Sequence, residues 1–164
     1  MIDTKEEQVY NLLESLTIKY IRHEHIPVYT VEEAQALDIK IPGQQCKNLF
    51  LRNKKGNKHY LVILDENKKV DLKYLSKQIE SDSLSFASEE RLYRYLSLTP
   101  GSVTPFGLIN DINKEVIVVV DNDIVGKSVI NFHPNVNTAT ISISYDGFNK
   151  FIKSMGNKLY YVNI

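Results

Sequence analysis

Residues 101–111 read Gly-Ser-Val-Thr-Pro-Phe-Gly-Leu-Ile-Asn-Asp, and they directly precede the most strand-like run of the chain, Val116 to Val120. Proline fixes the backbone angle φ and removes a hydrogen-bond donor, whereas glycine permits positive φ and the close approach of another group. A segment this apolar is not typical of a solvated connector. Two interpretations stay open from these residues alone: an ordered loop that forms a pocket wall, or a turn that delivers the chain into the strand.

The chain after this segment is rich in strands. Beyond Val116 to Val120, alternating and β-branched patterns predict strands over 129–132, 138–143 and 159–162. Between the last two, residues 144–155 predict a helix with Phe148, Phe151 and Ile152 on its apolar side, and Gly156 is typical of a helix C-terminus.

The chain before this segment mixes helices with a hairpin. Thr4 with Glu7 and Thr30 with Glu33 have the spacing of capping boxes, which predicts a helix after each. Residues 18–25 are expected to be extended. Two apolar runs, 46–52 and 59–64, flank a turn at 53–56 and predict a hairpin. Further helices are expected after caps at Asp71 and Ser88.

Strands and helices mix here without regular alternation, so we expect an α+β fold with a mixed, largely antiparallel sheet wrapped by helices. The length of 164 residues fits a single domain spanning residues 1–164. No internal repeat or linker-like change of composition divides the chain.

Composition excludes several classes of protein. Lys and Arg together number 20, as do Asp and Glu, and this zero net charge argues against broad coating of DNA or RNA. No apolar run approaches the ~20 residues that a membrane helix needs. The polar start of the chain is unlike a secretory signal, and one cysteine makes neither an internal disulfide nor a cysteine-based metal site. We expect an intracellular, cytoplasmic protein without DNA or membrane partners.

Lys47 is the first candidate for chemistry. In a strand over 46–51, Lys47 shares one face with Leu49 and Leu51, while Cys46 and Asn48 share the other with Phe50. Both faces are largely apolar, and a buried ammonium is costly unless it is paired or faces a polar cavity. Lys47 therefore either reaches water from the strand end or points into a ligand site.

The neighbours of Lys47 are harder to assign. The Asn48 amide can satisfy nearby backbone groups or reach a ligand. Cys46 is interpreted as a small core residue rather than a nucleophile.

A histidine turn is the second candidate. His133 precedes Pro134, which favours extended backbone at a strand end. The alternatives are a site residue and a histidine that packs locally. His23, His25 and His59 are expected at exposed or edge positions. His23 and His25 can share a strand face, but no cysteine or recognisable third ligand lies near them, so a metal site is not predicted. The chain contains no nucleophile elbow, Walker loop or dinucleotide fingerprint.

At these places the sequence resembles the YbaK/ProX family of aminoacyl-tRNA deacylases, which are related to the editing insertion of bacterial prolyl-tRNA synthetases. Four stretches carry the resemblance in the family order, at 27–34 (PVYTVEEA), 46–51 (CKNLFL), 101–111 (GSVTPFGLIND) and 132–140 (FHPNVNTAT). The loop at 101–105 together with Phe132-His133-Pro134 is similar to the ProX or PrdX branch, which clears alanine from tRNA(Pro).

The resemblance implies hydrolysis of the ester that joins a misloaded amino acid, alanine first, to tRNA(Pro). A positioned water and stabilisation of the developing oxyanion suffice for such an activated ester, without a metal or cofactor. The implied catalytic residues are Lys47, Asn48 and Gly101. The implied substrate-binding residues are Thr30, Ser102, Val103, Thr104, Pro105, Gly107, His133 and Asn137, with His133 bordering the amino-acid side chain.

The implied partners are the aminoacylated acceptor end of tRNA(Pro) and, as a second candidate, prolyl-tRNA synthetase. Two alternatives remain open at this point. One is the same hydrolysis with cysteine- or serine-charged tRNA, and the other is a non-catalytic module that binds tRNA ends or a synthetase.

Overall fold

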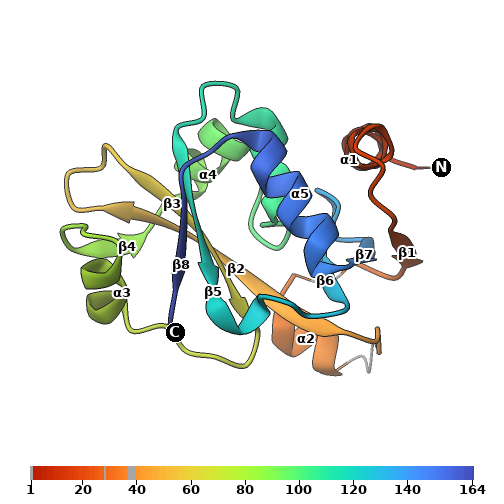
Figure 1. Cartoon of the computed structure of the whole chain (residues 1–164), viewed down its shortest axis with the longest axis horizontal. Helices are drawn as coiled ribbons and strands as arrows, with labels where there is room; N and C mark the ends of the chain where they lie inside the picture. Colours follow the sequence, from red (N-terminus) through yellow and green to blue (C-terminus); the bar gives the residue numbers. More distant parts are fainter. Residues whose placement is uncertain (1, 28, 37–39) are drawn as a thin grey trace.

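The computed structural model describes residues 2–27, 29–36 and 40–164 (Figure 1). Its helices are α1 (Thr4–Ser15), α2 (Val31–Ala36), α3 (Leu72–Gln78), α4 (Glu89–Leu96) and α5 (Tyr145–Met155), with short 3₁₀ helices η1 (Pro105–Asn110) and η2 (Asn122–Ile124). Its strands are β1 (Ile21–Glu24), β2 (Gln44–Asn53), β3 (His59–Asp65), β4 (Leu84–Phe86), β5 (Val116–Asp121), β6 (Ile130–Phe132), β7 (Ala139–Ile143) and β8 (Leu159–Val162).

These strands form one mixed sheet in the order β1-β7-β6-β2-β3-β5-β8, with β4 pairing to β2 beside this path. The pairs β1–β7, β2–β3, β2–β4 and β6–β7 are antiparallel, and β2–β6, β3–β5 and β5–β8 are parallel. The predicted α+β fold with a mixed, mainly antiparallel sheet is confirmed. The hairpin of β2 and β3 is also confirmed. Sequence patterns missed β4 and both 3₁₀ helices, each only three to six residues long.

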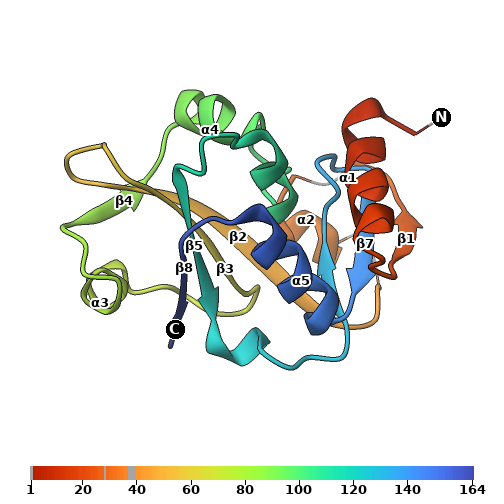
Figure 2. The same ribbon diagram turned by 45° about the horizontal axis from the view of Figure 1, so that its top comes forward.

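Two apolar cores lie on opposite faces of the sheet. In β3, Leu61 and Ile63 join the larger core with side chains of α1, α4, η1 and α5. Tyr60, Val62 and Leu64 join the smaller core with side chains of α3. Figures 1 and 2 show α3 at one end of the sheet and α1 at the other, beside β1. Because both faces of β3 are covered, its residues 60–64 are apolar without a break.

Helix starts follow the capping residues with one correction. The side chains of Asp71 and Ser88 accept hydrogen bonds from backbone N–H groups of α3 and α4, as predicted. The capping box predicted at Thr4 and Glu7 is wrong. Asp3 is the cap, its carboxylate accepting from the Lys5 N–H at 2.8 Å, and aspartate caps helices at least as well as threonine.

Residues 101–111 form an ordered loop that begins and ends in hydrogen bonds. The Thr104 hydroxyl accepts from the Phe106 N–H and starts η1. Near the other end, the Asn110 amide donates to the Leu96 carbonyl at 2.9 Å. Buried Asp111 then accepts from the backbone N–H groups of residues 115 and 116, at 3.1 and 2.8 Å. The loop is therefore fixed to both α4 and the start of β5.

His59 is buried, at 2% exposure, so the prediction of an exposed or edge position is wrong. Its ring lies between Phe50 and Tyr95, with centroids 5.6 and 4.1 Å away. Its Nε2 lies 2.9 Å from Arg91 Nη1, and because a guanidinium only donates, Nε2 accepts and the ring is neutral. Burial first, and then the charge of Arg91, lowers the pKa of His59 to about 4.

This lowered pKa predicts a specific loss of stability in acid. The neutral form is favoured by the fold, so the contribution of His59 is complete above the unfolded pKa of about 6.5 and is lost as the pH falls towards 4. Between pH 7 and pH 4 the free energy of unfolding should fall about 3 kcal/mol more in the wild type than in His59→Gln, which stays neutral. Urea unfolding of both proteins across this range measures the difference, and parallel pH profiles would contradict it.

The close packing of Gly107 against Leu98 predicts that a larger residue at position 107 lowers the stability of the fold. A Cβ at Gly107 would come within 2.5 Å of Leu98 Cδ1, closer than real Cβ contacts. Gly107→Ala should therefore lower the free energy of unfolding by about 1–3 kcal/mol through overpacking. Thermal and urea unfolding measure the change. An unchanged stability together with a loss of activity would instead assign Gly107 to substrate contact.

Candidate active site

Strand β2 has a partner along one edge and a gap along the other. On one edge, β3 pairs with it from Cys46 to Arg52. On the opposite edge, β6 pairs only with residues 44 and 45, and β4 only with residues 51–53. Among the residues that the structure describes, a single backbone hydrogen bond reaches this edge between them, from the Ala87 N–H to the Phe50 carbonyl at 2.9 Å. The edge over residues 46–49 is therefore open.

Local sequence explains why both flanking strands stop at this gap. His133 is the next residue that would pair with β2, but among the described residues no backbone hydrogen bond joins His133 to that strand. Asn135 then takes a left-handed conformation with φ of 63° and turns the chain away. On the other side, β4 ends at Phe86 because Ser88 starts α4 as its cap.

Main-chain groups of β2 point into this gap. In an antiparallel ladder, the backbone groups of alternate residues face opposite edges. The Gln45 carbonyl accepts from the Glu66 N–H at 3.1 Å on the β3 side, and the Phe50 carbonyl faces the other edge. Even-numbered residues therefore turn their N–H and C=O groups to the open edge. Within the described part of the chain, the Cys46 C=O and the Asn48 N–H and C=O have no hydrogen-bond partner.

A cavity of about 210 Å³ lies at this gap. Its wall includes four consecutive residues of β2, 45–48, although successive side chains point to opposite faces. A cavity touches all four only if it approaches the strand at its edge. Six residues assigned from the family resemblance line it: Thr30, Lys47, Asn48, Gly101, Val103 and His133. Their catalytic and binding roles remain predictions.

Lys47 lies at this wall, half-buried, which favours the site interpretation of this lysine. Glu66 lines the same cavity from the end of β3, on the same face as Lys47 in the register of the hairpin. Burial and the neighbouring Asp65 raise the pKa of Glu66, and the positive charge of Lys47 opposes that rise. The cavity thus holds one basic and one acidic group.

His133 lines the cavity and has a neutral imidazole ring. Its Nδ1 lies 3.0 Å from the Ala139 carbonyl, which only accepts, so Nδ1 carries the proton. Burial lowers the pKa of His133 below its usual value. The neutral ring therefore leaves Nε2 as an acceptor, and none of the described residues donates to it.

His25 was missed as a site residue, although it was predicted to share a face with His23. Its Nδ1 donates to the Ile26 carbonyl at 2.8 Å, and its Nε2 lies 2.8 Å from the Thr140 hydroxyl. The His25 and His133 rings are 6.0 Å apart, edge to face. His25 thus connects β1 and β7 to the histidine side of the cavity.

The other two candidates on β2 lie on the face opposite Lys47. The Asn48 amide donates to the Val103 carbonyl at 3.2 Å and joins β2 to the 101–111 loop, while its Oδ1 is buried without a partner. Cys46 packs against the larger core, as predicted. Burial first, and then the negative charges of Asp65 and Glu66, raises the pKa of the Cys46 thiol, so a thiolate nucleophile is disfavoured.

Five other residues assigned to the substrate do not line the cavity. They are Ser102, Thr104, Pro105, Gly107 and Asn137. Thr104, Pro105 and Gly107 are buried in the loop, where they start η1 and pack on neighbouring side chains. The structure thus assigns these three residues a supporting position behind the wall.

Gly101 lies close to another part of the chain itself. It takes φ of +89°, and a Cβ there would come within 3.0 Å of Tyr29 Cδ1 and 3.2 Å of Tyr29 Cα. Gly101 and Val103 make the loop one wall of the cavity. Position 101 nevertheless needs a glycine because of the close approach of Tyr29. Tyr29 and Thr30 directly precede α2, and the Thr30 hydroxyl accepts from the Glu33 N–H at 3.0 Å as the capping box predicted. Val28, in the same matching stretch, lies outside the described residues.

Further cavity residues were not predicted: His25, Tyr29, Ile41, Gln45, Glu66, Asn131, Phe132 and Thr140. Counting outward from the hairpin turn would have placed Glu66 opposite Gln45. The rest depend on β6 and β7 lying beside β2, which no local pattern shows. In the part of the chain that the structure describes, no group of three or more His, Cys, Asp or Glu side chains could hold a metal ion, and no helix there is long and apolar enough to span a membrane.

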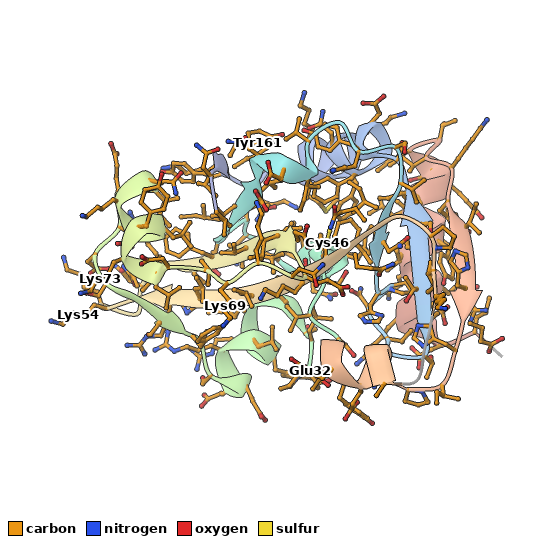
Figure 3. The ribbon with its side chains drawn as sticks, turned by 90° about the horizontal axis from the view of Figure 1, so that it is seen from below. Glu32, Cys46, Lys54, Lys69, Lys73 and Tyr161 are labelled. Atoms are coloured by element: carbon orange, nitrogen blue, oxygen red, sulfur yellow. The ribbon has the colours of Figure 1, made fainter. Side chains whose placement is uncertain are left out.

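Figure 3 shows how this region lies in the molecule. Cys46 is near the middle of the view, and α2, which carries Glu32, lies beside it. Lys54 and Lys73 lie together at the far end of the molecule. Lys54, in the hairpin turn, is therefore remote from the cavity wall at Cys46.

Comparison with known proteins identifies the family of this chain. The family model described as the aminoacyl-tRNA editing domain matches residues 25–151. The prolyl-tRNA editing protein ProX of Acetoanaerobium sticklandii is 49% identical over 152 residues, 93% of each chain. Prolyl-tRNA synthetase associated domain-containing protein 1 of Bos taurus is 34% identical over 149 residues, 88% of this chain and 86% of that one.

Solved structures show the same fold. The structure of a candidate trans-editing enzyme for prolyl tRNA synthetase covers 100% of this chain and 99% of its own, with a TM-score of 0.71 at 18% identity. The hypothetical protein APE2540 covers 94% of this chain and 98% of its own, with a TM-score of 0.73 at 16% identity. The family model spans most of the chain, and the relatives match over nearly their whole length, so this chain belongs to the aminoacyl-tRNA editing domain family.

Proposed function

We propose that this protein is a hydrolase that deacylates mischarged tRNA(Pro) in trans, with alanine as the preferred misloaded amino acid. The observation that carries the proposal is the cavity at the open edge of β2, which brings Lys47, Asn48, Gly101 and His133 together. The prolyl-tRNA editing protein that shares 49% identity over 93% of the chain supports the substrate class.

The residues of the cavity suit direct attack by water. An aminoacyl ester is already activated, so it needs a positioned water and charge stabilisation rather than a covalent intermediate. The raised pKa of the Cys46 thiol argues against a covalent route through this residue. Lys47 is assigned to the developing negative charge or the acceptor end, and the neutral His133 ring to the border of the amino-acid pocket.

The size of the cavity supports a small amino acid. At about 210 Å³ it is smaller than the ~300–1,000 Å³ typical of small-molecule sites, so it suits the aminoacyl end rather than the whole terminal nucleoside. A small pocket excludes the larger proline by overlap, whereas rejecting a smaller residue in a larger pocket is much harder. Clearance of alanine is therefore the physically favoured assignment.

The surroundings of the reaction follow from this substrate. We propose the acceptor end of tRNA(Pro) as the main partner and prolyl-tRNA synthetase as a second one. The cytoplasm, where tRNA is charged, is the proposed location. The zero net charge of the chain favours a contact limited to the tRNA end over a broad electrostatic interface.

A panel of charged tRNAs tests the function and its alternatives. Ala-tRNA(Pro) should lose its amino acid faster than Cys- or Ser-tRNA(Pro), and Pro-tRNA(Pro) should decay only at its spontaneous rate. Release of labelled amino acid measures each reaction. Faster loss of cysteine or serine would assign a different misloaded amino acid, and tRNA binding without any hydrolysis would identify a non-catalytic module.

Lys47 provides a test of the site. Lys47→Ala should lower kcat/KM for Ala-tRNA(Pro) about a hundredfold, because a charge that stabilises the transition state is removed. Lys54→Ala is the matched control, since this lysine is exposed at the end of the hairpin, away from the cavity (Figure 3). Circular dichroism confirms that both variants are folded. Equal activities of the two variants would remove Lys47 from the active site.

A further inference from the structure

The open edge of β2 carries two main-chain groups with the spacing of one amino-acid residue. The Cys46 C=O and the Asn48 N–H face the same edge, and neither has a hydrogen-bond partner among the described residues. In a parallel sheet, an added residue donates its N–H to one such carbonyl and accepts at its C=O from the N–H two residues further on. An aminoacyl ester presents the same two groups, an α-nitrogen donor and a carbonyl acceptor.

Strand β6 already uses this edge one position earlier. It runs parallel to β2, with Gln45 opposite Asn131, and the Gln44 N–H donates to the Val129 carbonyl at 2.9 Å. The next position along the same edge lies opposite Lys47. By register this position belongs to His133, but among the described residues no backbone hydrogen bond joins His133 to β2, and the cavity lies at this point.

We propose that the aminoacyl group of the substrate binds as one residue of a parallel strand opposite Lys47. Its α-ammonium donates to the Cys46 C=O, and its ester carbonyl accepts from the Asn48 N–H. This assignment rests on the proposed deacylase function and adds a catalytic main-chain group to it. The backbone of β2 thereby recognises what all aminoacyl esters share, while side chains around the cavity distinguish one amino acid from another.

The Asn48 N–H then has a defined part in the reaction. Water adds to the ester carbonyl carbon, and the π-electron pair moves to the carbonyl oxygen as the new C–O bond forms. The tetrahedral intermediate collapses when the ribose oxygen leaves with the bonding pair and takes up the proton that the attacking water has lost, giving the free amino acid and tRNA. A donor held by a β-strand at the carbonyl oxygen stabilises the negative charge where it develops.

Replacing the N–H by an ester oxygen tests this directly. Lactate incorporated at position 48 removes the backbone N–H. The reference variant is Asn48→Ala, which has the same methyl side chain as lactate but keeps the N–H. The lactate protein should show kcat/KM for Ala-tRNA(Pro) reduced about tenfold to a hundredfold relative to Asn48→Ala. Values equal within about twofold would overturn the assignment.

Position 50 supplies a matched control on the same edge. The Phe50 N–H also faces away from β3, and Phe50 does not line the cavity. Phenyllactate at position 50 removes that N–H without changing the side chain. Both ester substitutions weaken one carbonyl that pairs with β3, so they share the structural cost. The position 50 variant should keep the wild-type kcat/KM, and an equal loss at both positions would show a general effect of the ester and overturn the assignment.

A stable substrate analogue separates this inference from the function itself. In 3′-alanylamino-3′-deoxyadenosine, an amide replaces the labile ester. Titrated into ¹⁵N-labelled protein, it should shift the amide resonance of Asn48 more than those of Lys47 and Leu49, whose N–H groups pair with β3. A shifted Asn48 resonance in a protein that hydrolyses no mischarged tRNA(Pro) would leave the binding mode in place and reject the function. Hydrolysis by the wild type with an unmoved Asn48 resonance would reject the binding mode alone.

Discussion

The candidate active site depends on one constraint of sheet topology, the loss of a hydrogen-bonded neighbour along one edge of β2. Strands β6 and β4 both stop pairing along this edge, since the chain after β6 turns at the left-handed Asn135 and Ser88 starts a helix after β4. β2 itself remains rigid there, since β3 pairs with its other edge over the whole gap. The protein thus holds unpaired main-chain groups in a fixed position, which an isolated edge strand would not do.

Hydrogen bonds and close contacts from several elements surround and support this gap. Asp111 joins the 101–111 loop to β5, and the Asn48 amide joins the same loop to β2. The left-handed Gly101 lets Tyr29 approach the loop, so the segment that leads into α2 closes another side. His25 and His133 form the side opposite, each with its Nδ1 proton held by a carbonyl group. Side-chain positions in the cavity are therefore fixed by backbone contacts.

Most of the fold could be predicted from local patterns, because caps, periodicity and a hairpin turn act within a few residues. The helix caps at Asp71 and Ser88 and the β2–β3 hairpin were predicted in this way. The predicted exposure of His59 was wrong because its burial depends on Arg91 and Tyr95, which are more than thirty residues away in sequence. The site was predicted in part, since Lys47 and His133 are unusual in their local context. Glu66 and Thr140 reach the cavity only through strand pairing, and Gly107 resembles a contact residue in sequence but packs on Leu98.

A crystal structure with bound 3′-alanylamino-3′-deoxyadenosine tests the central claim most directly. The account predicts that the alanyl group lies along the open edge of β2. Its nitrogen should lie within about 3.2 Å of the Cys46 carbonyl oxygen, and its carbonyl oxygen within about 3.2 Å of the Asn48 backbone nitrogen. The ribose would then lie at the mouth of the cavity near Lys47. An alanyl group bound away from β2, such as in the groove between α1 and α5, would contradict the account.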